Sequence, residues 1–435
     1  MFEFTLKKRM LKLAAVSLSL TVAVGLAGCA ATAEPQADET QASEDVELLL
    51  WLQRDEFLPT DGFAQFEADN PGITVRAVTV PAEEQISTFL RSSAAGDTPD
   101  VLMPTTDLWP ALAQEGLLYD MTEQLAKWQA DDPEGFADAA VGIVFGTAED
   151  GITYGVGISG APTWMTYRAD WFAEAGIDTP QTYNDLLKAA RVIKQERPGV
   201  TPFGIVGART SSPAAKFLTL FYRMGGESVN GIPQFDSEAG RFLLGYYQTL
   251  MREELAHPDT LAWTSGESRG SMIEGIEGMT MISQNIYPTL NGTLEYGSEW
   301  ALLPGLYREG AQSEMVMTFR AVTALVAGNT LYPDEAALLV RYLAGPDYGL
   351  DLSVRYQPSL NASVATNPEY LAVAPWAPDL ESYVAAAKPL PANVVSSALY
   401  DIVHDMKQEA ISNPNADVAD IAKRAQAQMT AIAED

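Results

Sequence analysis

The stretch that most constrains the fold lies near the middle of the chain, at residues 151–187. Two short extended runs, Tyr154–Ile158 and Trp164–Arg168, are separated there by Gly160 and Pro162, and a helical pattern follows the second run. Glycine and proline are the strongest breakers of regular structure, so they divide the runs into two strands. The pattern predicts a chain that leaves one lobe and begins another. Two lobes joined in this way would leave a cleft between them.

Before this crossing the sequence alternates between strand and helix patterns. Val46–Leu52 is a short apolar run, Ile73–Val80 alternates apolar and polar residues, and Val101–Met103 is apolar again. The intervening residues carry apolar side chains at helical spacing, as at Phe63 and Phe66. Strands that alternate with helices form parallel sheets, which bind ligands beyond the carboxyl ends of their strands. The predicted fold class is therefore α/β.

The alternation continues after the crossing. Thr182 is placed to cap a helix, Met279–Ser283 is a buried strand pattern, and Thr318–Val326 is a long apolar β run followed by a helix. Two further helical patterns, at residues 394–411 and 418–432, close the chain. The second half therefore also has an α/β pattern.

The crossing contains a glycine-rich run, residues 155–160, that matches G-x-G-x-x-G. In dinucleotide-binding folds this turn opens a helix whose N-terminus meets the pyrophosphate. Here the residues that follow, Ala161-Pro162-Thr163-Trp164, do not begin a helix pattern. We interpret the run as a hinge in which glycines absorb dihedral change.

Several segments, taken in order, carry a resemblance to a known family. They are AAGDTPDVLM at 94–103, LAQEGLLYDM at 112–121, PTWMTYRADWFAEAGI at 162–177 and GIEGMTMISQNIY at 275–287. Together they resemble family 1 extracellular solute-binding proteins, the maltose-binding-protein-like receptors of carbohydrate ABC importers. The resemblance covers nearly the whole chain from about Val46 onward. It implies a two-lobed periplasmic-binding-protein type II fold with a hinge and an interlobe cleft.

The resemblance also implies how the chain divides into lobes. Lobe 1 would comprise residues 46–157 and 314–356, and lobe 2 would comprise residues 161–305 and 359–435. Hinge segments would lie near residues 157–161, 305–314 and 356–359. Closure around a ligand would then be a rotation about these hinges.

The N-terminal residues have the order of a secretory signal. Met1–Lys12 is basic, Leu13–Leu26 is an uncharged apolar run, and small residues precede Cys29. Residues 1–28 are therefore predicted to be a lipoprotein signal peptide, with Cys29, the only cysteine, as the point of lipid attachment. The alternative is an uncleaved anchor helix, because the uncharged stretch also approaches the ~20 residues of a membrane span.

Residues 29–45 are predicted to be a flexible tether, because residues 30–45 contain acids, no base and no large apolar side chain. With either interpretation of the N-terminus, the folded body would lie outside the cytoplasmic membrane. Its expected location is the extracytoplasmic face of the bacterial cell membrane, in the periplasm or at the cell surface. The membrane would be contacted through the N-terminal lipid only.

Charge and the scarcity of metal ligands argue against several classes of function. The formal net charge of −31 disfavours nucleic acid and anionic membrane surfaces as partners of the folded body. A single cysteine allows no intramolecular disulfide, and two histidines without an HExxH pattern do not make a zinc site or a Cys–His pair. We expect a monomer with no cofactor and no catalytic metal. A structural Ca²⁺ held by oxygen ligands stays open.

Aromatic and polar residues fall where predicted strands end, as a sugar site would require. A sugar presents C–H faces and hydroxyl groups, so its site needs flat rings together with carboxylates, amides or guanidinium groups. Any single tryptophan could equally well pack in a core. From their positions and from the resemblance, the predicted ligand contacts are Trp51, Asp55, Asp107, Trp109, Trp164, Gln284, Asn285, Tyr287, Phe319, Arg320 and Tyr400.

Two of these residues carry alternatives, and a third departs from the family's pattern. Arg320 stands in an apolar β run, where a charge is costly unless paired, so it either meets a lobe carboxylate or reaches the ligand, which we favour. Tyr400 matches a frequent aromatic sugar contact of the family, with core packing as the alternative. Tyr287 follows a strand after which relatives often place a tryptophan, so the chain departs there from the usual stacking platform.

The sequence thus predicts a lipid-anchored receptor, not an enzyme, that captures a sugar or oligosaccharide and presents it to an ABC permease. The main alternative is the same fold with a non-sugar solute, such as a polyamine, a sugar phosphate or a compatible solute. Cationic cargo would suit the many acids, whereas a phosphate ester would need several bases, and only Arg54 and Arg320 suggest themselves. A secreted glycoside hydrolase is less favoured, because acid pairs such as Asp55-Glu56 arise by chance among 58 acids.

Overall fold

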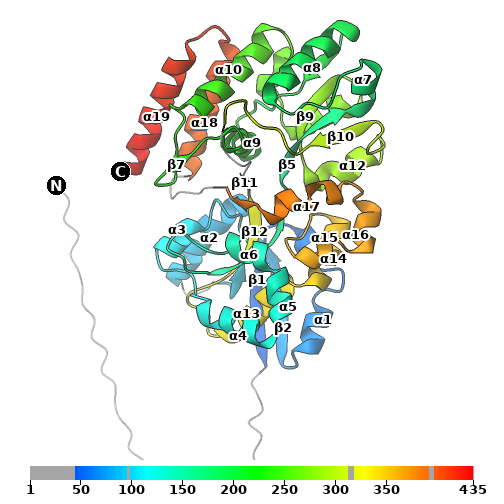
Figure 1. Ribbon diagram of the computed structural model, residues 1–435. Coiled ribbons are helices and arrows are strands. Elements are labelled where there is room, and N and C mark those ends of the chain that lie inside the picture. Colours follow the sequence, from blue (N-terminus) through cyan, green and yellow to red (C-terminus); the bar gives the residue numbers. More distant parts are fainter. Residues whose placement is uncertain (1–44, 96–97, 312–317, 391–395, 435) are drawn as a thin grey trace, which may run out of the picture. The chain divides into compact units, whose positions relative to one another are not determined.

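The computed structural model describes residues 45–95, 98–311, 318–390 and 396–434, which belong to one compact unit, Glu44–Asp435. The predicted signal peptide, Cys29 and nearly all of the predicted tether lie outside these residues. Within the described part of the chain, no helix is both long and apolar enough to span a membrane. Two main sheets, each with helices packed around it, form the folded body (Figure 1).

The first sheet has five strands in the order β2-β1-β3-β12-β4. They are β1 (Val46–Leu52), β2 (Ile73–Thr79), β3 (Val101–Leu102), β4 (Gly155–Gly160) and β12 (Ala321–Val326). β1 pairs in parallel with β2 and β3, as the alternation of strand and helix patterns predicts. β12 instead runs antiparallel to β3 and β4. A late segment of the chain thus returns to the sheet that the first described residues begin.

Helices enclose this sheet and bury its strands. Leu48 and Leu50 of β1 and Val326 of β12 have no exposed surface, and they pack with Leu339 of α13 in one core. Trp51 of β1 and Leu325 of β12 are buried in a second core. Because neighbouring strand residues point to opposite faces, the two cores show that the sheet is covered on both sides. The helices of these parts of the chain are η1 (Asp55–Phe57), α1 (Ala64–Asp69), α2 (Ala82–Ala95), α3 (Pro110–Gln114), α4 (Thr122–Asp131), α5 (Pro133–Asp138), α6 (Ala140–Phe145), α13 (Pro333–Leu343) and α14 (Pro346–Arg355).

The second sheet has four strands in the order β10-β5-β9-β6. They are β5 (Thr163–Arg168), β6 (Thr201–Phe203), β9 (Glu277–Ser283) and β10 (Trp300–Leu303). β5 is antiparallel to β9 and β10, and β6 is parallel to β9. The other elements that follow the crossing are α7 (Ala169–Glu174), α8 (Tyr183–Glu196), α9 (Ser211–Arg223), β7 (Ser228–Val229), β8 (Ile232–Pro233), α10 (Glu238–Arg252), η2 (Pro258–Ala262), α11 (Ser265–Ile273), η3 (Gln284–Ile286), α12 (Tyr287–Asn291), α15 (Ala362–Ala365), α16 (Pro368–Val373), α17 (Ala377–Ala385), α18 (Ser396–Ser412) and α19 (Val418–Glu434).

The predicted cap of α8 is confirmed. The Thr182 side chain accepts a hydrogen bond from the Asp185 backbone, and the Asp185 carboxylate accepts one from the Thr182 backbone. Such a capping box satisfies two N–H groups that the helix itself leaves without partners. Hydrogen bonds from Lys188, and then from the Thr182 hydroxyl, lower the pKa of Asp185 to about 2. The start of α8 is therefore fixed by local polar contacts.

The crossing connects the two sheets. β4 pairs with β12, β5 pairs with β9, and only Ala161 and Pro162 lie between β4 and β5. The G-x-G-x-x-G run forms β4 itself and opens no helix. Its glycines lack positive φ, and a Cβ on Gly155 would lie 1.9 Å from the Ala324 carbonyl oxygen. Close packing accounts for the other two glycines as well, because Cβ atoms at Gly157 and Gly160 would meet the Phe145 and Phe319 side chains. That the run also acts as a hinge stays a prediction.

Two other segments lie beside the crossing. The backbone N–H of Gly160 donates to the Pro358 carbonyl at 3.0 Å, and that of Leu360 donates to the Ile158 carbonyl at 3.1 Å. A short parallel ribbon of β11 (Thr318–Phe319) and β13 (Lys388–Pro389) leads into β12. The implied lobe boundaries and hinges stay predictions, and residues 312–314 of the hinge near 305–314 lie outside the described residues.

Candidate functional site

Residues that follow strands of both sheets converge on a hollow of about 260 Å³. This is the place where the strand-end rule for α/β sheets expects a ligand. We call it the cationic cavity. It is lined by Gln53, Arg54, Thr105, Ala161, Thr163, Ala215, Lys216, Thr219, Ser283, Asn285, Phe319, Arg320, Val322, Tyr356, Gln357 and Leu390.

The segment after β1 supplies an amide and a guanidinium group to the cavity wall. β1 ends at Leu52, so Gln53 and Arg54 are the first residues beyond it. Nε2 of the buried Gln53 donates to the Met103 carbonyl at 3.1 Å, which holds the amide beside the end of β3. Arg54 is exposed, and its guanidinium bonds to no carboxylate of the described residues. This cation is therefore available to a solute.

Arg320, Asp107 and Tyr400 meet at the edge of the cavity. Arg320 Nη1 donates to Asp107 Oδ2 at 3.3 Å, and the Tyr400 hydroxyl donates to the same oxygen at 2.6 Å. The Asp107 side chain is 2% exposed, whereas that of Arg320 is 25% exposed and lines the cavity. Burial, and then the Asp107 carboxylate, raises the pKa of Tyr400 well above its usual value, so the hydroxyl stays a donor. Because Tyr400 belongs to α18 and Asp107 follows β3, this bond connects helices packed on the second sheet with the first sheet.

A buried lysine lies in the wall on the side of the second sheet. Lys216 of α9 is 4% exposed, and its Nζ donates to the Met281 carbonyl of β9 at 3.0 Å. Burial, and then the positive charge of Arg269, lowers the pKa of Lys216 to about 7. No carboxylate of the described residues forms an ion pair with it. Since an ammonium group has three donors, two are left for a solute.

Neutral polar groups complete the wall. Thr163 of β5 and Ser283 of β9 are opposite each other in the sheet, and their hydroxyl oxygens lie 3.1 Å apart. Asn285 follows β9, and the Nε2 of Gln357 donates to the Ser159 hydroxyl at 3.2 Å. Amides and hydroxyls both donate and accept, so they match the hydroxyl groups of a polyol.

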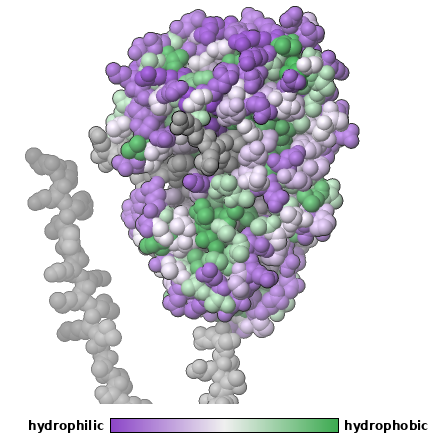
Figure 2. Space-filling view, in the orientation of Figure 1, coloured by the Kyte–Doolittle hydropathy of each residue, from purple (hydrophilic) through white to green (hydrophobic). Residues whose placement is uncertain are grey.

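A second, larger hollow of about 820 Å³ adjoins the first at Leu390, which lines both. We call it the apolar cavity. Figure 2 shows apolar side chains gathered over α6, whose Val144 is 47% exposed. The cavity is lined by Thr106, Trp109, Pro110, Ala113, Gln114, Ile143, Val144, Phe145, Thr147, Ala148, Glu149, Asp150, Asn230, Gly231, Lys388, Pro389 and Leu390.

The structure brings together some of the predicted ligand contacts. Asn285, Phe319 and Arg320 line the cationic cavity, and Asp107 and Tyr400 bond to each other beside it. Arg320 pairs with a carboxylate, which is the first alternative considered for it, and it also lines the cavity, so a contact with the ligand stays a prediction. These five residues stay our candidate contacts at this site.

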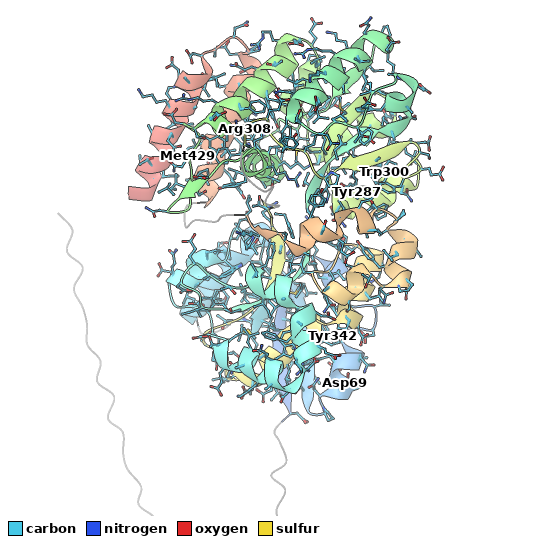
Figure 3. All side chains as sticks on the ribbon, in the orientation of Figure 1. Asp69, Tyr287, Trp300, Arg308, Tyr342 and Met429 are labelled. Atoms are coloured by element: carbon cyan, nitrogen blue, oxygen red, sulfur yellow. The ribbon has the colours of Figure 1, made fainter. Side chains whose placement is uncertain are left out.

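Two predicted aromatic contacts lie in the core of the second sheet. Trp164 and Tyr287 have no exposed surface, and the Tyr287 ring lies 5.2 Å from that of Trp300 (Figure 3). The Arg223 guanidinium covers the Trp164 ring at 5.0 Å. The prediction that these rings face a ligand is therefore corrected, because core packing occupies them.

The remaining predicted contacts are also placed away from the cationic cavity. Trp51 is buried edge-on against Phe89, and Trp109 lines the apolar cavity. Asp55 lies on the surface and accepts a hydrogen bond from the Thr79 hydroxyl. Gln284 lines a separate hollow of about 110 Å³ and bonds to the Tyr370 hydroxyl. For these four residues the structure gives packing or local bonds in place of a contact with the cationic cavity.

Sequence reasoning missed several residues of the wall. Lys216 had a signal, because a charged residue interrupts the apolar run from Pro213 to Phe221 of α9. Gln53 was missed because sequence reasoning selects Asp55, two residues further from β1, and strand ends are uncertain by a few residues in sequence reasoning. Gln357 and Thr219 had no distinguishing signal, since amides and hydroxyls are common on surfaces.

The wall supplies hydrogen-bond donors without a catalytic pair. Among the described residues that line it, there are three cations and no Asp or Glu. Glycoside hydrolysis normally uses two carboxyl groups facing each other across the bond. The described ranges also contain no group of three or more His, Cys, Asp or Glu placed to hold a metal ion. The geometry suits the binding of a polar solute.

Comparison with known proteins gives one family and several relatives. A family model described as bacterial extracellular solute-binding protein matches residues 52–349. The putative ABC transporter periplasmic-binding protein YcjN of Escherichia coli (strain K12) is 31% identical over 144 residues, which are 33% of this chain and 32% of YcjN. The putative binding protein BAB2_0491 of Brucella abortus (strain 2308) is 25% identical over 218 residues, 49% of this chain and 51% of that protein. The matches therefore span about a third of one relative and about half of the other.

Solved structures agree in fold over most of the chain. A solute-binding protein of an ABC transporter from Thermotoga lettingae TMO, bound with alpha-D-tagatose, has a TM-score of 0.70 at 19% identity and covers 89% of this chain and 99% of its own. The sugar-binding protein MalE from Xanthomonas citri has a TM-score of 0.74 at 17% identity, and the match covers 89% of this chain and 98% of MalE. The GacH receptor of Streptomyces glaucescens, solved unliganded and with acarbose, has a TM-score of 0.71 at 18% identity. The match covers 90% of this chain and 99% of GacH. The fold is the two-lobed α/β fold of periplasmic-binding proteins.

Proposed function

Since this chain belongs to the bacterial extracellular solute-binding protein family, we propose that it captures a sugar or short oligosaccharide in the cationic cavity and delivers it to an ABC permease. The observation that carries the proposal is that polar residues from both sheets' parts of the chain form the wall of the cationic cavity. Amides, hydroxyls and cations from the strand ends of both sheets and from α9 line one hollow. Structural neighbours bound to tagatose, acarbose or ribitol support a carbohydrate as the solute class.

Binding would favour a closed arrangement of the two lobes. A solute that contacts both walls stabilises the state in which the walls are close, which is a shift of population. The bond from Tyr400 to Asp107 is of the kind that closure would make, because it joins the same two parts of the molecule. The permease would recognise this closed state.

The location of the protein is part of the proposal. Cleavage before Cys29 and lipidation of its thiol would hold the body at the outer face of the cytoplasmic membrane through a flexible tether. Mass spectrometry of the protein extracted from membranes should then find Cys29 as the N-terminal residue, with lipid on its thiol. An intact N-terminus with an unmodified Cys29 would support the uncleaved anchor helix instead.

Calorimetric titration of the full-length protein with a panel of saccharides tests the binding function. At least one saccharide should bind, and Asn285→Ala should weaken it by about tenfold, because a buried polar partner of a ligand contributes ~1–3 kcal/mol. Gln65→Ala, on the exposed face of α1, is the matched control and should leave binding unchanged. Binding of polyamines alone would overturn the carbohydrate assignment. Consumption of the saccharide would overturn the assignment as a receptor.

A further inference from the structure

We propose that the solute is an anionic saccharide, a sugar that carries a carboxylate or phosphate group, and that Arg54, Lys216 and Arg320 hold this group. This inference rests on the proposed function and narrows its solute class. The charge of the wall opposes that of the chain. The protein has 58 acidic and 27 basic residues, yet the described residues that line the cavity include three bases and no acid.

The position of Lys216 provides the strongest argument. Transfer of an ammonium group from water into a protein is unfavourable unless an opposite charge and hydrogen bonds compensate it. Lys216 is 4% exposed, and the described residues offer it one carbonyl and no carboxylate. Its remaining N–H donors are available at the wall of a solvent-accessible hollow. An anionic group in that hollow would supply the missing charge.

The two other cations, Arg54 and Arg320, can contact the anionic group of the solute from the side of the first sheet. Arg54 follows β1 and has no carboxylate partner among the described residues, so its planar guanidinium is available for a forked contact with a carboxylate or phosphate. Arg320 is already paired with Asp107 and adds positive potential at the edge of the cavity. A solute anion between Arg54 and Lys216 would connect the two walls, as closure requires.

A second buried lysine shows why the position of Lys216 matters. Lys407 of α18 has no exposed surface, and its Nζ donates to the Val206 carbonyl at 3.3 Å. Burial, and then Arg209, lowers its pKa to about 7, as burial does for Lys216. Lys407 lines neither the cationic nor the apolar cavity. Burial alone therefore does not identify a ligand contact, and Lys407 is a matched control for Lys216.

The test is a calorimetric titration of the full-length protein with matched solutes. The probes are hexoses, the corresponding hexuronates and the hexose 6-phosphates, each in gluco, galacto and manno configuration, together with their disaccharides. The tightest binder should be an anionic member, at least about tenfold tighter than the neutral sugar of the same configuration, because charge-assisted hydrogen bonds are about twice as strong as neutral ones. Uronates and phosphates are separate arms, so the result identifies which anion the site takes.

Variants assign the preference to the cavity. Lys216→Met should weaken the anionic sugar by more than about tenfold and its neutral counterpart by less than about threefold, and Lys216→Arg should restore most of the loss. Lys407→Met should preserve the preference. Arg54→Gln should also reduce it, whereas Arg91→Gln, at an exposed arginine of α2 bonded to the Thr88 hydroxyl, should not. If Lys216→Met does not fold, the comparison of Arg54→Gln with Arg91→Gln decides whether the cavity causes the preference for an anion.

The possible outcomes separate the two proposals. A neutral sugar that binds as tightly as its anionic counterpart overturns the inference and leaves the receptor function standing. Tight binding of inorganic phosphate or acetate, without any saccharide, overturns the carbohydrate class while supporting an anion site. Binding of none of these probes contradicts both proposals. An anion preference that survives Lys216→Met and Arg54→Gln together overturns the assignment of the residues.

Discussion

The two hollows that meet at Leu390 offer a solute different walls. The apolar cavity is the larger, and it draws most of its wall from the first sheet's part of the chain, including Trp109 and the apolar residues of α6. The cationic cavity is smaller and takes its wall from the strand ends of both sheets and from α9. Volume alone would select the first hollow, whereas the demands of a hydroxylated solute select the second. The chemistry of the wall is thus the better guide to the site.

The largest expected difference between the hollows comes from filling each with an indole. Ser283→Trp should abolish solute binding, with a loss of at least about a hundredfold, because the ring would occupy the cationic cavity. Val144→Trp, in the wall of the apolar cavity, should change binding by less than about threefold. Calorimetric titration of both variants, with melting temperatures to verify folding, makes the measurement. A larger loss of affinity in Val144→Trp than in Ser283→Trp would assign the solute to the apolar cavity.

A smaller effect is expected from the bond beside the cationic cavity. Tyr400→Phe removes the hydroxyl that donates to Asp107 at 2.6 Å, and hydrogen bonds to charged groups contribute ~1.5–3 kcal/mol. The closed state should lose part of its stability, so the solute should bind about tenfold more weakly. Tyr222→Phe is the control, since its hydroxyl bonds to Ser228. Equal affinities for both variants would show that the bond is not linked to binding.

The pH dependence of binding should reflect Lys216. Its pKa is lowered from 10.5 to about 7, so the free protein loses this charge as the pH rises through that value. A bound anion favours the protonated form, so affinity for a hexuronate, whose carboxylate stays ionised over this range, should fall about fivefold from about pH 6 to about pH 8.5. The charged group that acts on Lys216 is Arg269, and Arg54 and Arg320 in the wall stay cationic over this range.

Titration of the same sugar into Lys216→Arg at each pH gives the control. Arginine stays protonated, so the affinity of this variant should be nearly independent of pH over the same range. A fall in affinity equal to that of the unsubstituted protein would show that another group titrates.

Stability has a pH dependence of its own that is independent of both hollows. Glu277 of β9 has no exposed surface, and burial raises its pKa to about 8, opposed by the hydrogen bond from Ser268. The folded state therefore keeps a proton that the unfolded state releases, and this stabilisation is lost as the pH rises toward about 8. Glu277→Gln is neutral at every pH. Its free energy of unfolding, relative to the unsubstituted protein, should rise by about 3–4 kcal/mol from about pH 5 to about pH 8 in chemical denaturation.

Solute affinity serves as the internal control for this variant. Because Glu277 lines neither hollow, Glu277→Gln should bind like the unsubstituted protein. Parallel stability profiles for the two proteins would show that Glu277 is ionised in the folded state.

The order of the elements was predictable because it rests on periodicity. The run at Val46–Leu52 and the cap at Thr182 carry local signals, and both are found in the structure. The run at Thr318–Val326 is also extended, but it is divided at Arg320 into β11 and β12. The antiparallel direction of β12 was not predictable, because pairing direction depends on how distant segments pack. The glycines of β4 gave a local signal with two meanings. The nearby Ala324 backbone shows close packing, which only the tertiary fold could reveal, and the hinge stays a prediction.

The site was predictable where residues directly follow strands, as for Asn285 and Arg320. It was not predictable for the aromatic rings, because a tryptophan near a strand end can face the cleft or the core. Trp164 faces the core, where its large apolar area is removed from water. Lys216 lies on a helix far in sequence from the other contacts, so only the tertiary fold brings it to the cavity wall.

A crystal structure of the protein with the tightest-binding saccharide of the panel tests the central claim most directly. The account predicts the sugar in the cationic cavity, with its anionic group within about 3 Å of Lys216 Nζ or of the Arg54 guanidinium, the length of a charge-assisted hydrogen bond. Asn285 would bond to a sugar hydroxyl. A sugar found in the apolar cavity, stacked against Trp109 and remote from Lys216, would contradict the account.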